Sequence, residues 1–497
     1  MTFYVTTAIP YVNAAPHLGH ALELVQADVL ARHRRLRGED VRFLTGTDDN
    51  ALKNVTAARA TGVDVAAFVK ANGDRFADLR GPLDLSFDDF IRTGSDPRHA
   101  PGVTALWRRS AADFYRREYT GRYCAGCERF LDGAACPEHP AAPETVAETN
   151  WFFRLSRYQR RILDVLESGR VRVEPAPRRN EVLAFVRAGL RDISVSRPAA
   201  RAGGWGIPVP GDPDQVIYVW WDALANYVTA LGDDAAYRRW WAGSTERVHV
   251  IGKGIVRFHA VYWLALLLSA GLPLPTAIFV HDYLTVDGAK LSKSAGNAVD
   301  PVALAGRYGV DALRWWLLRE TATVGDTDFT ERRLIERADR DLAGGVGNLV
   351  NRTLTLARRH GVAPAEVGSD LGGRVNAALA RADFRAATDA VWAEVDRGNR
   401  LIEARQPWKL ADPAPVLAEL LGICQVLAGE LRPFIPSGAE RLLAQLRSDG
   451  PPRPAFPRLG AARSDQVVDA AQHRPGGQGR RFQARTAPDD ERRLLAG

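Results

Sequence analysis

The hydrophobic positions of the N-terminal region switch between the spacing of strands and that of helices. Residues 3–9 are rich in β-branched and aromatic side chains, which indicates a short buried strand. Asn13 and Pro16 mark a turn, and the apolar spacing from Pro16 to Leu30 is helical, with proline at a favoured first helical position. We therefore predict that residues 1–114 form the first half of a doubly wound parallel sheet.

The same alternation returns after an interruption. Residues 115–212 form the interruption, and residues 213–283 resume the pattern with apolar runs at 215–220 and 247–251 that we predict as buried strands. Ligands of an open parallel sheet bind beyond the carboxyl ends of its strands. Three residues that follow predicted strands should therefore lie near one another: His17, Asp48 and Gly252.

The C-terminal third has a different pattern. Alanine, leucine and arginine recur at helical spacing from about residue 336 to about 445, so we predict an all-helical domain over 336–460. Residues 284–335 connect it to the sheet. Residues 461–497 are rich in Arg, Gly, Pro and Gln with few aliphatic side chains, which predicts a disordered tail.

Composition narrows the class of protein. The 497 residues are 46% hydrophobic, enough for more than one buried core. We expect no apolar run long enough to span a bilayer, and no hydrophobic signal segment precedes the first strand, so we predict a cytoplasmic protein without disulfides. The net charge of +7 permits contact with nucleic acid.

Two histidines lie where the first strand should run into the first helix. His17 and His20 are three residues apart and therefore share one face of the first helical turn. The unpaired amides and the positive dipole end at this point attract anions. Imidazoles placed there can donate hydrogen bonds to a phosphate as negative charge builds in a transition state. The alternative is two surface histidines near a helix cap.

A second cationic segment lies far along the chain. Lys290-Leu291-Ser292-Lys293-Ser294 follows a predicted strand at 277–281 and a tight turn at 286–288. A loop on a strand edge can bring Lys290 and Lys293 to a triphosphate as flexible point charges. The alternative is a solvated loop. The chain has neither a Walker-type loop nor a Gly-x-Gly-x-x-Gly fingerprint, the two commonest phosphate motifs.

Three of the four cysteines form a metal-ligand pattern. Cys124 and Cys127 are separated by two residues, as are Cys136 and His139. Two such pairs on a short hairpin suit tetrahedral Zn²⁺ with three thiolates and one imidazole, in a closed structural site with one zinc per chain. Cys424 lies in a helical pattern and is predicted to be a core residue.

Together these segments resemble the methionyl-tRNA synthetases, a family of class I aminoacyl-tRNA synthetases. Six further stretches match in family order, and the resemblance extends to about residue 460: 8–11, 43–48, 179–183, 205–210, 218–220 and 249–253. The resemblance implies an α/β class I synthetase fold, with a Rossmann-like doubly wound parallel sheet, a zinc-bearing insertion and an all-α anticodon-binding bundle. It also implies activation of L-methionine with ATP and Mg²⁺, and transfer of methionine to the 3′ end of tRNA(Met).

The resemblance also implies roles for single residues. The catalytic residues would be His17, His20, Lys290 and Lys293. ATP would contact these four and Gly252, Lys253 and Ser292. A thioether offers no strong hydrogen-bonding group and must be recognised by shape and aromatic contact. The methionine pocket would comprise Ala8, Ile9, Tyr11, Asp48, Trp220, Tyr227, Ile255 and His259. Asp48 would pair with the substrate ammonium group, and Glu23 would lie near the acceptor adenosine. The alternatives are ordinary core aromatic residues and a plain surface glutamate.

The helical domain would bind the anticodon. Asn348 and Arg352 are four residues apart and share a helix face, and Trp408 matches a tryptophan that stacks on an anticodon base in the family. Base–aromatic stacking contributes about 1–3 kcal/mol per base. The alternative for Trp408 is a packed aromatic at a helix end. The resemblance gives no sign of the extra C-terminal dimerisation domain of some relatives, so we expect a monomer.

The chain departs from the family pattern in four places. Asp49-Asn50-Ala51 replaces the usual Glu-His-Gly, Gly254 replaces an aspartate near the nucleotide, Asp282 replaces a glycine, and Leu291 replaces a methionine. Two hypotheses compete with the ligase function that the resemblance implies. In the first, which Asn50 and Gly254 motivate, the chain is a divergent paralogue that uses another acceptor or resists an inhibitor. In the second, it is a catalytically inert RNA-binding factor that keeps the fold. The intact histidines and lysines argue against the second.

Overall fold

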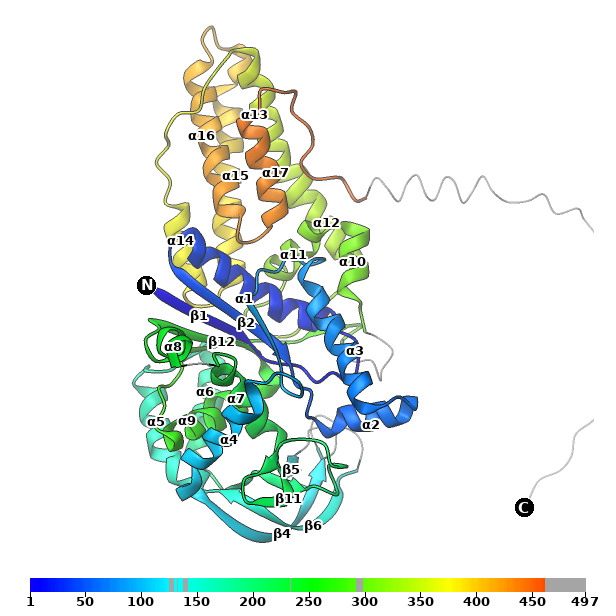
Figure 1. Cartoon of the computed structure of the whole chain (residues 1–497). Helices are drawn as coiled ribbons and strands as arrows, with labels where there is room; N and C mark the ends of the chain where they lie inside the picture. The colour runs from blue at the N-terminus through cyan, green and yellow to red at the C-terminus, as the bar shows by residue number, and fades with distance from the viewer. Residues whose placement is uncertain (125–128, 132, 137–141, 233, 292–297, 461–497) are drawn as a thin grey trace, which may run out of the picture.

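A part built around β-sheets and a bundle of helices lie at opposite ends of the computed structural model (Figure 1). The structure describes residues 1–124, 129–131, 133–136, 142–232, 234–291 and 298–460. For three residues only the backbone is described: Arg129, Phe130 and Lys290. Several predicted features therefore lie outside the described residues: Cys127, His139, Ser292, Lys293 and the tail at 461–497.

The main sheet has six strands, and every neighbouring pair is parallel. Their order across the sheet is β3 (Asp89–Arg92), β2 (Asp40–Thr47), β1 (Thr2–Thr7), β12 (Glu246–Gly252), β13 (Ala277–His281) and β7 (Arg172–Glu174). The direction in which strands are added reverses between β1 and β12. This is the switch point of a doubly wound sheet, where ligands of such folds bind.

Alternate side chains of each strand enter two different cores, as the two-residue period of a strand requires. Val250 and Phe279 face one core, whereas Ile251 and Val280 face the other. The first core contains α1 (Leu18–Leu36), α3 (Val65–Ala77), α10 (Pro301–Tyr308) and α11 (Val310–Arg319). The second contains α4 (His99–Arg109), α5 (Gln159–Glu167), α6 (Ala176–Arg187), α7 (Val219–Thr229) and α9 (Leu264–Ala270). This part also contains α2 (Leu52–Thr61) and α8 (Asp234–Tyr237).

The predicted strands and first helix are present with two corrections. Helix α1 begins at Leu18 with His17 as its N-cap, so Pro16 precedes the helix and is not its first residue. The run 215–220 does not enter the parallel sheet. It ends β11 (Asp212–Ile217), which pairs with β9 (Ser196–Pro198) and β10 (Pro208–Val209), and then begins α7. An apolar run alone cannot specify which partner strand it meets.

The insertion between the two halves of the parallel sheet contains an antiparallel sheet of its own. Its four strands are β5 (Arg129–Leu131), β4 (Phe114–Cys124), β6 (Glu144–Phe153) and β8 (Ile193–Ser194), and neighbouring strands are antiparallel. The same stretch of chain also supplies β7 to the edge of the parallel sheet. Cys124 and Cys136 are buried, with 3% and 8% of their surface exposed. Beyond β13 a small sheet contains β15 (Ala289–Lys290), β14 (Leu284–Val286) and β16 (Thr327–Asp328).

The C-terminal region is helical as predicted. Its helices are α12 (Glu331–Arg337), α13 (Asn348–Arg359), α14 (Leu371–Leu379), α15 (Phe384–Arg405), α16 (Ala414–Leu431) and α17 (Pro436–Arg447). Their buried side chains continue the core that covers α1 and α11. Cys424 is fully buried, which confirms its predicted place in the core, and burial raises the pKa of its thiol to about 12.

One helix among the described residues, α16, is long and apolar enough to cross a membrane by length and composition. The expectation that the chain contains no such run is therefore wrong. The central helix of a bundle has the same property because neighbouring helices surround it, and α16 contacts α13, α15 and α17.

Candidate active site

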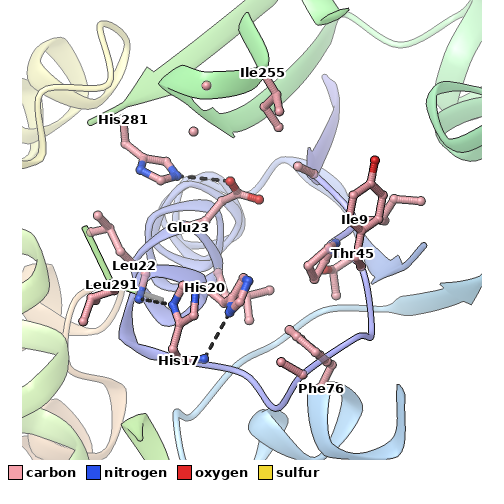
Figure 2. Close-up of a pocket in the computed structure, with 18 of the residues that line it drawn as sticks. Ile9, His17, His20, Leu22, Glu23, Thr45, Phe76, Ile255, His281 and Leu291 are labelled. Carbon is pink, nitrogen blue, oxygen red and sulfur yellow. Dashed lines mark hydrogen bonds and ion pairs between the residues drawn. The ribbon is translucent and has the colours of Figure 1, made fainter. Parts of the chain in front are cut away.

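A cavity of about 520 Å³ opens at the switch point of the parallel sheet. It is bounded by the loop after β1, the first turns of α1 and the segments that follow β12 and β13 (Figure 2). Eight residues predicted from the sequence line it together: Ala8, Ile9, Tyr11, His17, His20, Trp220, Gly252 and Ile255. Glu23 and Leu291 also line it. The sheet therefore brings together residues up to about 280 positions apart, as the switch-point argument predicts.

The two histidines cap α1 reciprocally. The backbone N–H of Gly19 donates to Nδ1 of His17, and the backbone N–H of His17 donates to Nδ1 of His20, both at 3.1 Å. The two rings stack with centroids 3.8 Å apart. Because Nδ1 is the acceptor in both rings, the proton of a neutral imidazole must be on Nε2. A side chain at Gly19 would collide with the His17 ring, at 2.9 Å from Cε1.

Burial keeps His20 uncharged. Desolvation, and then the nearby imidazoles of His17 and His281, lower the pKa of His20 well below its ordinary value. Its ring is therefore a neutral hydrogen-bond donor through Nε2–H, beside the amides at the start of α1. This arrangement offers hydrogen bonds to an anion without placing a full positive charge there.

An ion pair lies at the cavity one helical turn beyond His20 (Figure 2). Nε2 of His281 lies 3.1 Å from Oε2 of Glu23, and Nδ1 of His281 lies 2.9 Å from the carbonyl oxygen of Asp282. Burial by itself lowers the pKa of His281, but Glu23, and after it Asp282, outweigh this effect through hydrogen bonds and charge, and the pKa is raised above its ordinary value. Both ring nitrogens of charged His281 then donate, to Glu23 and to Asp282.

The lysine segment begins in a hairpin that reaches the cavity. β14 pairs with β15, with Thr285 opposite Lys290, and the turn between the strands has positive φ angles at Asp287 (53°) and Gly288 (72°). This is the tight turn that the sequence predicts. Leu291 follows directly, is 4% exposed and lines the cavity. The predicted roles of Ser292 and Lys293 lie outside the described residues.

An aromatic wall closes the cavity on the side of α7. Trp220 stacks on Phe258 with ring centroids 3.7 Å apart, and Tyr11 lies against Trp220 at 6.3 Å. Tyr227 and His259 do not line the cavity and are buried away from solvent. The Tyr227 hydroxyl lies 2.6 Å from Nε2 of His259, whose Nδ1 lies 3.0 Å from the carbonyl oxygen of Ile255.

Neutral His259 holds this arrangement in one orientation. Burial lowers the pKa of His259 to about 4, so the uncharged ring donates from Nδ1 to Ile255 and accepts from the Tyr227 hydroxyl. The pair thereby fixes the backbone of Ile255, which does line the cavity. Asp48 also lies outside the lining and is 2% exposed, next to Tyr11 in a short parallel bridge.

The four departures from the family pattern have different surroundings. Asn50 does not line the cavity, and its side-chain amide donates to Asp222 at 2.7 Å. Gly254 lines the cavity and contributes no carboxylate there. Asp282 lines it too, but its carboxylate is engaged by Arg178 and by the backbone N–H of Gly325. Leu291 occupies a buried lining position that suits any side chain of similar volume.

The resemblance implies that Lys253 contacts ATP, but its side chain does not line the cavity. Its ammonium lies 2.5 Å from Asp326 and over the ring of Tyr283. The cavity contains a different lysine that was not predicted, Lys53, whose ammonium lies 5.6 Å from the ring centroid of Tyr11. Other lining residues missed from the sequence are Thr45, Phe76, Phe90, His281 and Tyr283. Of these, only His281 could have been predicted as a site residue from the sequence, because it lies at the carboxyl end of a predicted strand.

The predicted anticodon residues lie on the surface of the bundle. Asn348 and Arg352 are exposed on α13 one turn apart. The Trp408 side chain is 52% exposed, on the connection between α15 and α16, with Leu410 close by at 40%. An indole exposed to this extent is not the packed helix-end aromatic of the alternative interpretation.

Comparisons with known proteins agree with this geometry. The family model for class I tRNA synthetases (M) matches residues 3–141 and 133–354. The chain is similar to the methionine–tRNA ligase of Brucella suis, with 40% identity covering 89% of this chain and 91% of that protein. It is also similar to the enzyme of Mycobacterium bovis, with 40% identity covering 92% and 94%.

Solved structures are similar over the same extent. Mycobacterium tuberculosis methionyl-tRNA synthetase in complex with methionyl-adenylate superposes with a TM-score of 0.82 at 39% identity, covering 89% of this chain and 93% of that one. The apo form of the same enzyme gives a TM-score of 0.78 at 35% identity, covering 92% and 98%. Neither the paralogue nor the inert-factor hypothesis gains support from these similarities.

Proposed function

The chain belongs to the methionine–tRNA ligases, a family of class I aminoacyl-tRNA synthetases, and from that premise we propose which of its residues carry each step. It activates L-methionine with ATP to methionyl-adenylate and pyrophosphate, and it transfers the methionyl group to the 3′ end of tRNA(Met). The observation that supports the residue assignment best is the reciprocal cap of His17 and His20, which puts the proton of each neutral ring on Nε2 at the end of α1 that lines the cavity.

The first step needs no protein nucleophile. The methionine carboxylate attacks the α-phosphorus of ATP in line, a P–O bond forms, and the bond to the leaving pyrophosphate breaks. His17 and His20 donate to the phosphate oxygens on which negative charge accumulates. Lys290 and Lys293 hold the departing phosphates, and Gly252 allows the nucleotide to approach β12 closely. A divalent cation such as Mg²⁺, when bound with ATP, would neutralise charge on the phosphates.

The methionine side chain is recognised by the aromatic wall. Trp220 and Tyr11 provide polarisable surfaces for the thioether, and Ala8, Ile9 and Ile255 define the length of the slot. Tyr227 and His259 position Ile255 from behind rather than through direct contact. Asp48 receives the substrate ammonium group, which requires its carboxylate to become accessible from the cavity.

The hairpin insertion holds a structural zinc in this proposal. Cys124 and Cys136 are buried near the β4–β5 hairpin and supply thiolates, the donors that zinc favours. Cys127 and His139 complete the ligand set. Within the part of the chain that the structure describes, no group of three or more potential ligands is found, and Cys127 and His139 lie outside that part.

Three further properties complete the proposal. Asn348, Arg352 and Trp408 recognise the anticodon, and their exposure on the bundle supports this role. The enzyme acts as a monomer, because one chain supplies both the cavity and the bundle. It acts in the cytoplasm, where thiolate ligands of zinc remain reduced.

The experiment that tests this function is amino-acid-dependent exchange of pyrophosphate into ATP, measured with each of the twenty amino acids in turn. We expect exchange with methionine alone and without tRNA, followed by charging of methionine tRNA when it is added. Exchange at the background rate for every amino acid overturns the function. Exchange with methionine but no charging of initiator or elongator methionine tRNA overturns the second step only.

A further inference from the structure

A fully buried arginine joins the helix of the histidines to the bundle. Arg314 on α11 and Asp28 on α1 are both 0% exposed, and Nη2 of the arginine lies 2.8 Å from Oδ2 of the aspartate. The same guanidinium donates at 3.0 Å or less to three backbone carbonyl oxygens, those of Leu83 at 2.9 Å, Pro433 at 3.0 Å and Phe434 at 2.8 Å. A longer hydrogen bond, at 3.4 Å, goes to the carbonyl oxygen of Asp84. Its planar fork of donors can satisfy several acceptors at fixed angles, which a lysine cannot do.

These acceptors come from three separate parts of the fold. Asp28 is in the middle of α1, whose first turn holds His17 and His20. Leu83 belongs to the connection after α3, and Pro433 and Phe434 form the turn between α16 and α17 of the bundle. Figure 1 shows α1 and α11 lying between the sheet and the bundle. A single side chain therefore joins the bundle to α1, the helix whose N-terminal end lines the candidate active site.

Other polar contacts follow the same seam. Further along α1, Nε2 of His33 lies 3.2 Å from Oδ1 of Asn376 on α14, and Arg37 pairs with Glu430 on α16. At the start of α17, the backbone N–H of Gly438 donates to Asp311 of α11 at 2.9 Å. The C-terminal half of α1 is thus part of the surface on which the bundle packs, and its N-terminal turn is part of the cavity.

We propose that Arg314 is a positioning residue for the tRNA-dependent step, because it fixes the bundle relative to the histidine end of α1. The inference rests on the proposed function, since it takes the bundle as the anticodon-binding part. A tRNA held by the bundle must deliver its 3′ end to the cavity. A displacement of about 1 Å at reacting atoms lowers a rate by about 10²-fold. Activation uses only small molecules in the cavity and does not depend on where the bundle lies.

The test separates the two half-reactions. The double variant Asp28→Asn/Arg314→Met removes the two fully buried charges together. Arg32, which also pairs with Asp28 at 2.8 Å, is 26% exposed, so water can reach its guanidinium in the variant. The introduced amide keeps an oxygen for the backbone N–H of Ser86, which donates to Asp28 at 2.7 Å in the unaltered protein. We expect kcat and both KM values for methionine-dependent exchange to stay within about twofold, whereas kcat/KM for tRNA falls at least about tenfold. Equal falls in exchange and charging, or no fall in charging, overturn the proposal.

One further variant serves as a control, and another replaces the double variant if that one does not fold. Leu417→Ala opens a cavity in the bundle core away from this seam, at a residue that is 0% exposed, and should lower thermal stability with little change in the ratio of charging to exchange. If the double variant does not fold, the ratio is measured for Arg314→Lys, which keeps the charge but cannot reach all three carbonyls. An unchanged ratio there overturns the proposal. Absence of charging by the unaltered protein would instead be a failure of the proposed function.

Discussion

Nε2 of His281 and Oε2 of Glu23 lie 3.1 Å apart across the cavity wall, and they come from β13 and α1, more than 250 residues apart in the chain. The pair fixes the Glu23 carboxylate at the cavity, one helical turn beyond His20 (Figure 2). Its strength depends on the protonation of His281, which gives the pair a measurable pH dependence.

We expect the contribution of this ion pair to the free energy of unfolding to decline as pH rises. The pKa of His281 is raised in the folded protein above its unfolded value of about 6.5. The contribution is therefore fully present below about pH 6.5 and is lost as pH rises through the folded pKa. The measurement is the NMR titration of the His281 ring. Glu23→Gln should lower its pKa, because the larger of the two acidic influences that oppose burial is lost and only Asp282 remains. An unchanged pKa in that variant would contradict the assignment.

The capping histidines predict a kinetic split. His17→Ala should lower adenylate formation by about 10²–10³-fold, because a donor to the transition-state oxyanion is lost. The KM for methionine should change little, since His17 does not touch the aromatic wall. The variant also loses a helix cap, which costs about 1 kcal/mol of stability. His17→Asn is the matched control, since its side-chain oxygen can still cap α1. An unaltered exchange rate in His17→Ala would remove His17 from the mechanism.

The exposed indole predicts a defect confined to tRNA. Trp408→Ala should lower kcat/KM for charging by about 5–150-fold, the equivalent of about 1–3 kcal/mol of lost base stacking, and should leave exchange unchanged. Leu410→Ala removes a similarly exposed apolar side chain two residues away and should have little effect. Comparable losses of kcat/KM for charging in the two variants would mean that tRNA binding depends on apolar surface in general and not on stacking of the Trp408 ring.

The zinc proposal predicts one metal ion per chain. Elemental analysis of the purified protein should find one equivalent of zinc, and Cys124→Ser should lose it, because zinc sites of this kind need every thiolate. Cys424→Ala changes a thiol buried in the bundle and should keep the zinc. A zinc-free but active unaltered protein would rule the site out.

Local patterns predicted the elements that local interactions form. The strand near residue 3, the turn at Asp287-Gly288 and the helices after residue 336 follow from periodicity and turn residues, and the structure contains them. Periodicity failed for the run at 215–220, since β11 pairs with β9 and β10 in a separate antiparallel sheet. The start of α1 was misplaced because the imidazole of His17 caps the helix, a role that proline spacing cannot reveal.

The amino-acid sequence alone determined the residue types that carry the chemistry and the order of the segments that contain them, because motif spacing and hydrophobic period are local properties. The tertiary structure decided which atoms of those residues are available. It put the histidine protons on Nε2, turned Lys253 to Asp326 and placed Lys53 in the cavity. It also buried Arg314 between α1 and the bundle. Each of these outcomes depends on a hydrogen-bond partner or neighbour chosen by folding, and spacing along a chain carries no record of that choice.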